Sequence, residues 1–119
     1  MPKAMTARSL IASTSVAAGG SNTGTALDVR AGFGMMVTAR VTNGSTGPTI
    51  ACTFKLEISN DNTNFRTFVE ATAQTGNNVV TSWAIDVPAT VMYIRAAFSG
   101  HTGQAVTVEA IGHEWTTLT

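Results

Sequence analysis

The sequence predicts an all-β protein, an antiparallel β-sandwich of about eight strands with a jelly-roll-like topology. Apolar and polar residues alternate with a period of two along most of the chain, whereas a helical period is hard to find. Clusters of Gly, Asn and Pro interrupt this alternation about every eight to fifteen residues. Twenty threonines, a β-branched type that favours strands, agree with this prediction. An immunoglobulin-like sandwich is the alternative, because alternation does not reveal strand order.

The first half of the chain begins with three predicted strands. Alternating segments occur at 9–16 and 27–30, and a flexible break rich in Gly, Ser and Asn separates them at 19–24. A longer segment, 33–42, follows a turn and ends in a loop at 43–48. The buried face of this longer strand is expected to comprise Phe33, Met35, Val37, Ala39 and Val41.

The clearest strand spans 50–59, where every second residue is apolar. Its buried face is expected to comprise Ile50, Cys52, Phe54, Leu56 and Ile58. After a polar stretch at 60–64, the next strand is expected at 65–72. Its alternation places Phe65 in the phase of a core residue and Phe68 on the opposite face.

The last three predicted strands span 79–87, 91–98 and 106–110. Trp83 lies on the apolar face of the first of these and is expected in the core. The alternation of the last strand shifts in phase near Gly112, where a glycine would tolerate a β-bulge.

Length and charge limit the class of protein. A chain of 119 residues suits one domain, 1–119. Seven basic and seven acidic side chains cancel, and the lack of a basic excess argues against specific nucleic-acid binding. No run approaches about 18 apolar residues, so no membrane span is predicted. Polar residues interrupt the N-terminal apolar stretch too often for a signal peptide, and we expect synthesis in a cytoplasm without export.

No residue set in the sequence points to catalysis, and we expect neither enzymatic activity nor a cofactor. The single cysteine, Cys52, cannot form an internal disulfide, and its phase places it in the core as a small apolar side chain. His101 and His113 are expected at the surface. No pair among these residues has metal-ligand spacing, so no metal site is predicted.

The polar stretch NDNTN at 60–64 has three possible interpretations. A calcium loop needs several carboxylates and a closing glutamate, whereas only Asp61 is acidic here. A carbohydrate site would need aromatic platforms, and only Phe65 and Phe68 flank the stretch. Asn and Asp suit tight turns, because they tolerate left-handed backbone and bond nearby amides. The residues favour a turn.

Several large side chains on nominally outward faces predict a protein-binding surface, provided that they cluster. Local cover by loops is the alternative explanation. The candidate interface residues are Ile11, Met36, Phe68, Arg95, Trp115 and Leu118.

Arg95 is unusual among these candidates because it shares a face with Val91 and Tyr93. It would sit at a sheet edge, reach a carboxylate such as Asp86, or enter the interface. The segments 1–8 and 113–119 carry few charges and are expected to form extended arms. Such arms can add a strand to a neighbour's sheet edge.

Two segments resemble the small structural proteins of tailed bacteriophages: KLEISNDNTNFRTFVEAT at 55–72 and WAIDVPATVMYIRAAFSGHTGQAVTVEA at 83–110. The shared pattern is a strand that ends in S-x-D before an aromatic residue, then Y-x-R with a Gly-rich hairpin leading to V-T-V-x-A. Within that group, the size is similar to that of jelly-roll capsid cement (decoration) proteins.

The resemblance implies a place on the capsid exterior of a virion, where the chain would bridge and stabilise capsid subunits. It implies two partners, the major capsid protein and further copies of the chain in a dimer or trimer. Tail and fibre proteins share the same pattern, so a tail- or fibre-associated module, or one that binds carbohydrate or a receptor, is the alternative. No functional residue carries over, because these proteins share binding surfaces rather than a catalytic motif.

Overall fold

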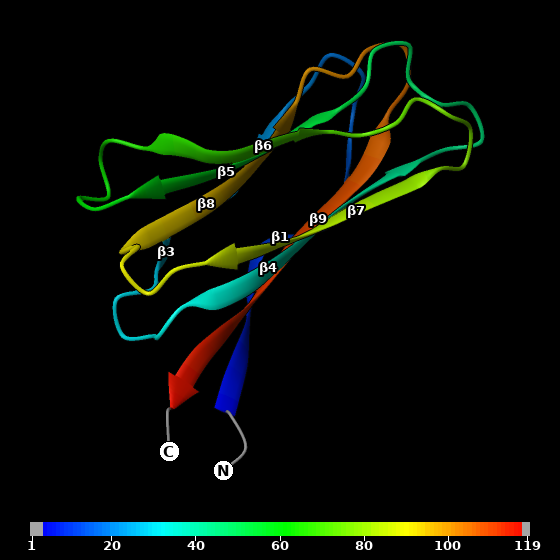
Figure 1. Ribbon diagram of the computed structural model, residues 1–119. Coiled ribbons are helices and arrows are strands. Elements are labelled where there is room, and N and C mark those ends of the chain that lie inside the picture. The colour runs from blue at the N-terminus through cyan, green and yellow to red at the C-terminus, as the bar shows by residue number, and fades with distance from the viewer. Residues whose placement is uncertain (1–3, 118–119) are drawn as a thin grey trace.

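The computed structural model describes residues 4–117 and the side chains of 5–116, and it shows two antiparallel sheets packed face to face (Figure 1). The four-stranded sheet A has the order β1 (Ala4–Val16), β9 (Val106–Thr117), β4 (Met35–Asn43) and β7 (Val80–Val87). In the five-stranded sheet B the order is β2 (Asn22–Thr23), β8 (Tyr93–Ser99), β5 (Thr53–Ser59) and β6 (Arg66–Thr72), and β3 (Leu27–Asp28) also pairs with β8. The predicted all-β sandwich is confirmed, with no helix in the described part of the chain.

The strand order is that of a jelly roll. The chain passes from sheet A to sheet B and back at nearly every connection, and only β5 and β6 are consecutive neighbours. The two short strands β2 and β3 pair with successive parts of β8, so they occupy one strand position and leave eight positions in all. The strand β2 lies inside the segment that was expected to be a flexible break.

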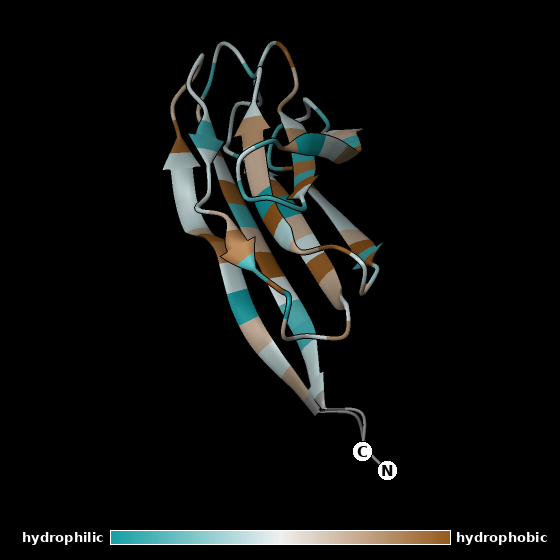
Figure 2. Ribbon diagram, turned by 90° about the vertical axis from the view of Figure 1, so that its left-hand side faces the viewer, coloured by the Kyte–Doolittle hydropathy of each residue, from teal (hydrophilic) through white to brown (hydrophobic). Residues whose placement is uncertain are grey.

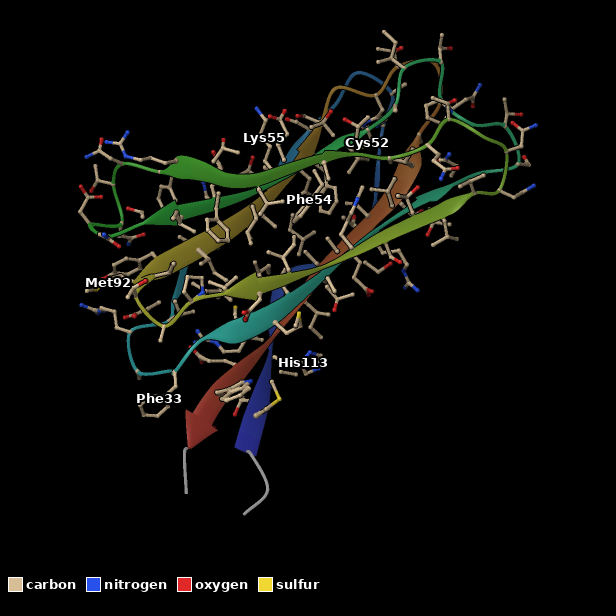
Figure 3. All side chains as sticks on the ribbon, in the orientation of Figure 1. Phe33, Cys52, Phe54, Lys55, Met92 and His113 are labelled. Carbon is tan, nitrogen blue, oxygen red and sulfur yellow. The ribbon has the colours of Figure 1, made fainter. Side chains whose placement is uncertain are left out.

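The core lies between the sheets and is built from alternating residues of the inner strands, as the bands of hydropathy along the ribbons indicate (Figure 2). Phe54 from β5 points into this layer (Figure 3) and is completely buried. Its ring lies 5.1 Å from that of Phe98 and is stacked at 5.6 Å on that of Trp83. Small residues such as Ala39 and Ala110, both fully buried, leave room for these rings.

Ile11 is buried, with 6% of its surface exposed, so the prediction that it points outward is wrong. The pairing of β1 with β9 skips a residue at Leu10, which forms a β-bulge. Because a bulge breaks the alternation, Leu10 and Ile11 both enter the core although they are adjacent in sequence.

Phe65 is not a core residue, because a second bulge changes the phase of β6. Relative to β5, strand β6 contains one extra residue at Phe68. Residues before the bulge therefore face the opposite way from the prediction. Phe65 lies on the outer face of sheet B, where the guanidinium of Arg95 sits 3.9 Å from the centre of its ring.

Two strands begin later than predicted, which leaves Phe33 and Ile50 outside the core. Their exposed fractions are 46% and 58%. The strand β4 begins at Met35 because Gly34 has a φ of +102°, which interrupts the extended backbone after Phe33. The strand β5 begins at Thr53, and Ile50 makes only an isolated bridge.

The predicted phase shift near Gly112 is also wrong. The pairing of β9 with β4 is continuous from Glu114 to Val106. Gly112 stays in the buried phase, where a Cβ would lie 2.9 Å from the sulfur of Met35. The glycine therefore makes room for the Met35 side chain, and the uninterrupted alternation turns Glu114 inward.

We predict that Phe54→Ala lowers the free energy of unfolding by about 3–5 kcal/mol, because it removes the ring on which two other aromatic side chains pack. Phe68→Ala is the matched control. Phe68 is 39% exposed, so the loss should stay below about 2 kcal/mol. Urea denaturation of both variants measures the difference, and similar losses would contradict the assigned core.

Candidate functional site

Met36 and Trp115, two of the predicted interface residues, lie together at one end of sheet A. They line a shallow hollow of about 240 Å³ with Phe33, Asp86 and Pro88. The main chain fixes this arrangement, because the Phe33 amide donates to the Trp115 carbonyl at 2.8 Å. The Trp115 amide in turn donates to the Gly34 carbonyl at 3.0 Å.

Met5 extends this surface, since it is the cross-strand partner of Trp115 and their side chains share a face. The exposed fractions of Met5, Phe33 and Met36 are 44%, 46% and 40%. We call the group Met5, Phe33, Met36 and Trp115 the apolar end patch. Figure 3 shows Phe33 and His113 at this end of the molecule. Met36 is the residue of β4 that pairs with His113.

The segments expected to form extended arms pair with each other where the structure describes them. Residues 4–9 of β1 lie antiparallel to 111–117 of β9, and this two-stranded ribbon runs past the other strands (Figure 1). Leu118 lies outside the described residues. The ribbon therefore carries Met5 and Trp115 at the end of the sandwich.

An ion pair that the residue pattern did not predict anchors the ribbon. Nη1 of Arg8 donates to Oε1 of Glu114 at 3.0 Å and to the main-chain carbonyl of Asp28 at 2.9 Å. The Glu114 side chain is buried, and a Cβ on Gly32 would overlap its carboxylate. The pair thus ties β1 to β9 and to the segment around β3. The burial of Glu114 could have been predicted, because Glu114 follows Val108 and Ala110 in the buried phase, but its pairing with Arg8 could not.

The remaining interface candidates do not join the apolar end patch. Phe68 is 39% exposed but belongs to β6 at the edge of sheet B. Arg95 lies on the outer face of sheet B, where its Nε donates to Oε1 of Glu57 at 2.8 Å. The carboxylate that pairs with Arg95 is therefore that of Glu57 and not that of Asp86.

The stretch 60–64 is a turn held by the Asp61 carboxylate. Oδ1 accepts the main-chain amides of Asn64 at 2.8 Å and Thr63 at 2.9 Å, and the Ser59 hydroxyl donates to it at 2.8 Å. The Asn64 amide side chain donates to Oδ2 at 2.9 Å. These donors, chiefly the two main-chain amides, lower the pKa of Asp61 well below its ordinary value. The φ of Asn62 is +59°, as expected for Asn in a tight turn.

His101 is completely buried, so its expected surface position is wrong. Its Nε2 lies 3.0 Å from the Val16 carbonyl, and its own carbonyl accepts the Gly19 amide at 2.9 Å. Gly100 and Gly103 have φ angles of +87° and +90°, which fold the loop back and turn the imidazole inward. His101 thereby joins the end of β1 to the connection before β9, while His113 is exposed as predicted.

Cys52 is buried as predicted, and burial raises the pKa of its thiol to about 11. Within residues 4–117, no three His, Cys, Asp or Glu side chains form a group able to hold a metal ion. Nor does this part of the chain contain a helix long and apolar enough to cross a bilayer.

The sequence matches no protein-family model and no curated protein sequence. The fold is similar to that of the K3 cleaved adhesin domain of Lys-gingipain from Porphyromonas gingivalis W83, with a TM-score of 0.54. The match covers 85% of this chain and 72% of that chain at 14% identity. At that identity, the likeness concerns the fold alone.

We predict that Asp61→Ala destabilises the protein at neutral pH and that the difference from wild type shrinks in acid. The folded pKa of Asp61 lies below its unfolded value of about 3.9, so the carboxylate stabilises the fold above that pH. This contribution is lost as the pH falls toward the folded pKa. Urea midpoints at about pH 7 and about pH 3 measure the effect.

Asp86→Ala is the control for this experiment, because no hydrogen bond to the Asp86 side chain is found among the described residues. The difference in urea midpoint between Asp86→Ala and the wild type should not shrink in the same way between about pH 7 and about pH 3. A difference between wild type and Asp61→Ala that stays constant over the pH range would contradict the turn-stabilising role of the carboxylate.

Proposed function

We propose that this protein is a bacteriophage capsid cement (decoration) protein that binds the outer surface of the capsid and bridges capsid subunits. Its partners are the major capsid protein and other copies of itself. It acts as a structural part of the virion and not as an enzyme. The sequence resemblance to small phage structural proteins and the jelly-roll strand order support this proposal.

The apolar end patch is the observation that carries the proposal. Three of its side chains are at least 40% exposed, although burial of such side chains stabilises a protein by about 1.5–3 kcal/mol each. Contiguous exposed apolar side chains beside a hollow are typical of protein-binding surfaces. The patch therefore supplies the binding energy for a capsid subunit.

The position of the apolar end patch suits a bridging role. Two of its residues, Met5 and Trp115, lie on a two-stranded ribbon that extends beyond the sandwich, and the Arg8–Glu114 pair holds that ribbon in place. A rigid ribbon loses little conformational entropy on binding. Many copies that each contact adjacent subunits would add their modest affinities through avidity.

Carbohydrate or receptor binding is the second candidate, and the hollow beside the 60–64 turn favours it. Ser59, Asn60, Asn64 and Arg66 place polar groups around that hollow. The nearby Phe65 ring is covered by Arg95, however, so it offers no open stacking platform. A glycan array with the purified protein separates the candidates, because saturable sugar binding would favour this one.

We predict that purified protein added to capsids lacking it binds them and raises their melting temperature. Met36→Lys should weaken binding at least tenfold, because it places a charge in the apolar end patch. Val80→Lys is the matched control, since Val80 is 54% exposed on the same face of sheet A but at its opposite end. Cosedimentation and differential scanning calorimetry measure both effects.

Failure of the wild-type protein to bind, with unchanged capsid stability, would overturn the proposed function. Equal binding by Met36→Lys and wild type would overturn the assignment of the surface alone.

A further inference from the structure

The sheet edges of this protein differ in how well they are protected against pairing with another strand. In sheet B, the edge strands β2 and β3 have only two residues each. The opposite edge strand, β6, carries Arg66 and Glu70 and contains a bulge. Short length, charge and bulges are the usual means of blunting a sheet edge. In sheet A, β7 carries Asp86 and is followed by Pro88.

The edge strand β1 is protected along only part of its length. Its second half contains the bulges between Ser9 and Thr14. The backbone at Gly24 also packs against this second half, so closely that a Cβ on Gly24 would overlap the Leu10 carbonyl. The first half, from Met5 to Ser9, follows β9 without a register shift and contains no proline.

The side chains of this first half leave its outer edge open. Arg8 carries the only charge, and it is turned toward Glu114 on the inner side of the sheet. Thr6, Ala7 and Ser9 are exposed, and the described part of the chain pairs β1 with β9 alone. An exposed edge of this kind is a template for another β-strand.

We infer that residues Met5–Ser9 of β1 pair antiparallel with the same residues of a second copy about a two-fold axis at Ala7. This register places Met5 opposite Ser9 and Thr6 opposite Arg8 of the second copy. It uses every residue of the bulge-free stretch. Two four-stranded sheets thereby join into one continuous sheet.

The distribution of charge favours a second copy as the occupant of this edge. The chain has a formal net charge of zero, so two copies do not repel each other as a whole. In the register centred on Ala7, neither Arg8 faces the other, whereas a shift that centres the axis on Arg8 would oppose two like charges. The pairing also places both apolar end patches on the same face of the joined sheet.

This inference specifies the self-association within the proposed function, but it is tested on the protein alone. In an Ala7→Cys variant the two introduced thiols would meet at the axis, and the native Cys52 is too buried to interfere. Mild oxidation should convert this variant to a disulfide-linked dimer on a non-reducing gel. Ala84→Cys is the matched control, because Ala84 is an exposed alanine on the same face of sheet A, in the other edge strand β7.

Sedimentation velocity supplies a second measurement that needs no cysteine. The wild type should sediment as a dimer, and Ala7→Asp should sediment as a monomer, because it places two carboxylates at the axis. Ala84→Asp should remain a dimer. Circular dichroism checks that each variant is folded. If a variant is not folded, the sedimentation of the wild type as a dimer or a monomer tests the inference.

A wild type that remains monomeric at its highest soluble concentration would overturn the inference, as would cross-linking through Ala84→Cys in place of Ala7→Cys. A monomer that still binds capsids would refute β1 pairing while leaving the proposed function intact. A dimer that does not bind capsids would support β1 pairing and refute the proposed function.

Discussion

The packing of Phe54 between Trp83 and Phe98 is the contact on which the two-sheet arrangement depends. These side chains come from β5, β7 and β8, so one cluster joins sheet B to the edge of sheet A. A strand can bury only one face in this layer, because successive side chains point to opposite sides. Every residue on the other face is left for solvent or for a partner. The outer faces therefore exist as potential binding surfaces because the inner faces are committed to the core.

The alternation of residue types was enough to predict the fold, and its main failures lie where a β-bulge or a glycine with positive φ interrupts a regular strand. Strands β4, β5 and β9 follow the period of two, and the inner residues of β4 and β5 were placed correctly from Met35 and Phe54 onward. Ile11 and Phe65 were misplaced because each lies next to a bulge, and a bulge reverses the phase without a clear mark in the sequence. His101 was misplaced because the glycines around it were interpreted as a surface turn. Their left-handed backbone instead directs the ring inward.

The candidate site was only half predictable for a related reason. Alternation identified Met36 and Trp115 as outward-facing, yet it could not show that β4 and β9 are neighbours. Neighbours in a sheet are set by long-range pairing, which leaves no local pattern in either strand. Phe33 and Met5 join the same surface only because of that pairing and the turn at Gly34. The Arg8–Glu114 pair was hidden for the same reason, since its partners lie at opposite ends of the chain.

The use of charge in this protein is the reason that the proposed recognition relies on apolar and main-chain contacts. Four arginines are paired within the described chain: Arg8 with Glu114, Arg30 with Asp28, Arg40 with Glu109, and Arg95 with Glu57. The Asp61 carboxylate is occupied by its own turn. The two exposed pairs, Arg30–Asp28 and Arg40–Glu109, add little stability. All four pairs cancel the field that would otherwise steer a charged partner. The features that the proposed binding would use are a cluster of large apolar side chains at one end of sheet A and an open strand edge beside it. Both contribute through close contact, which requires a partner surface of matching shape more than one of opposite charge.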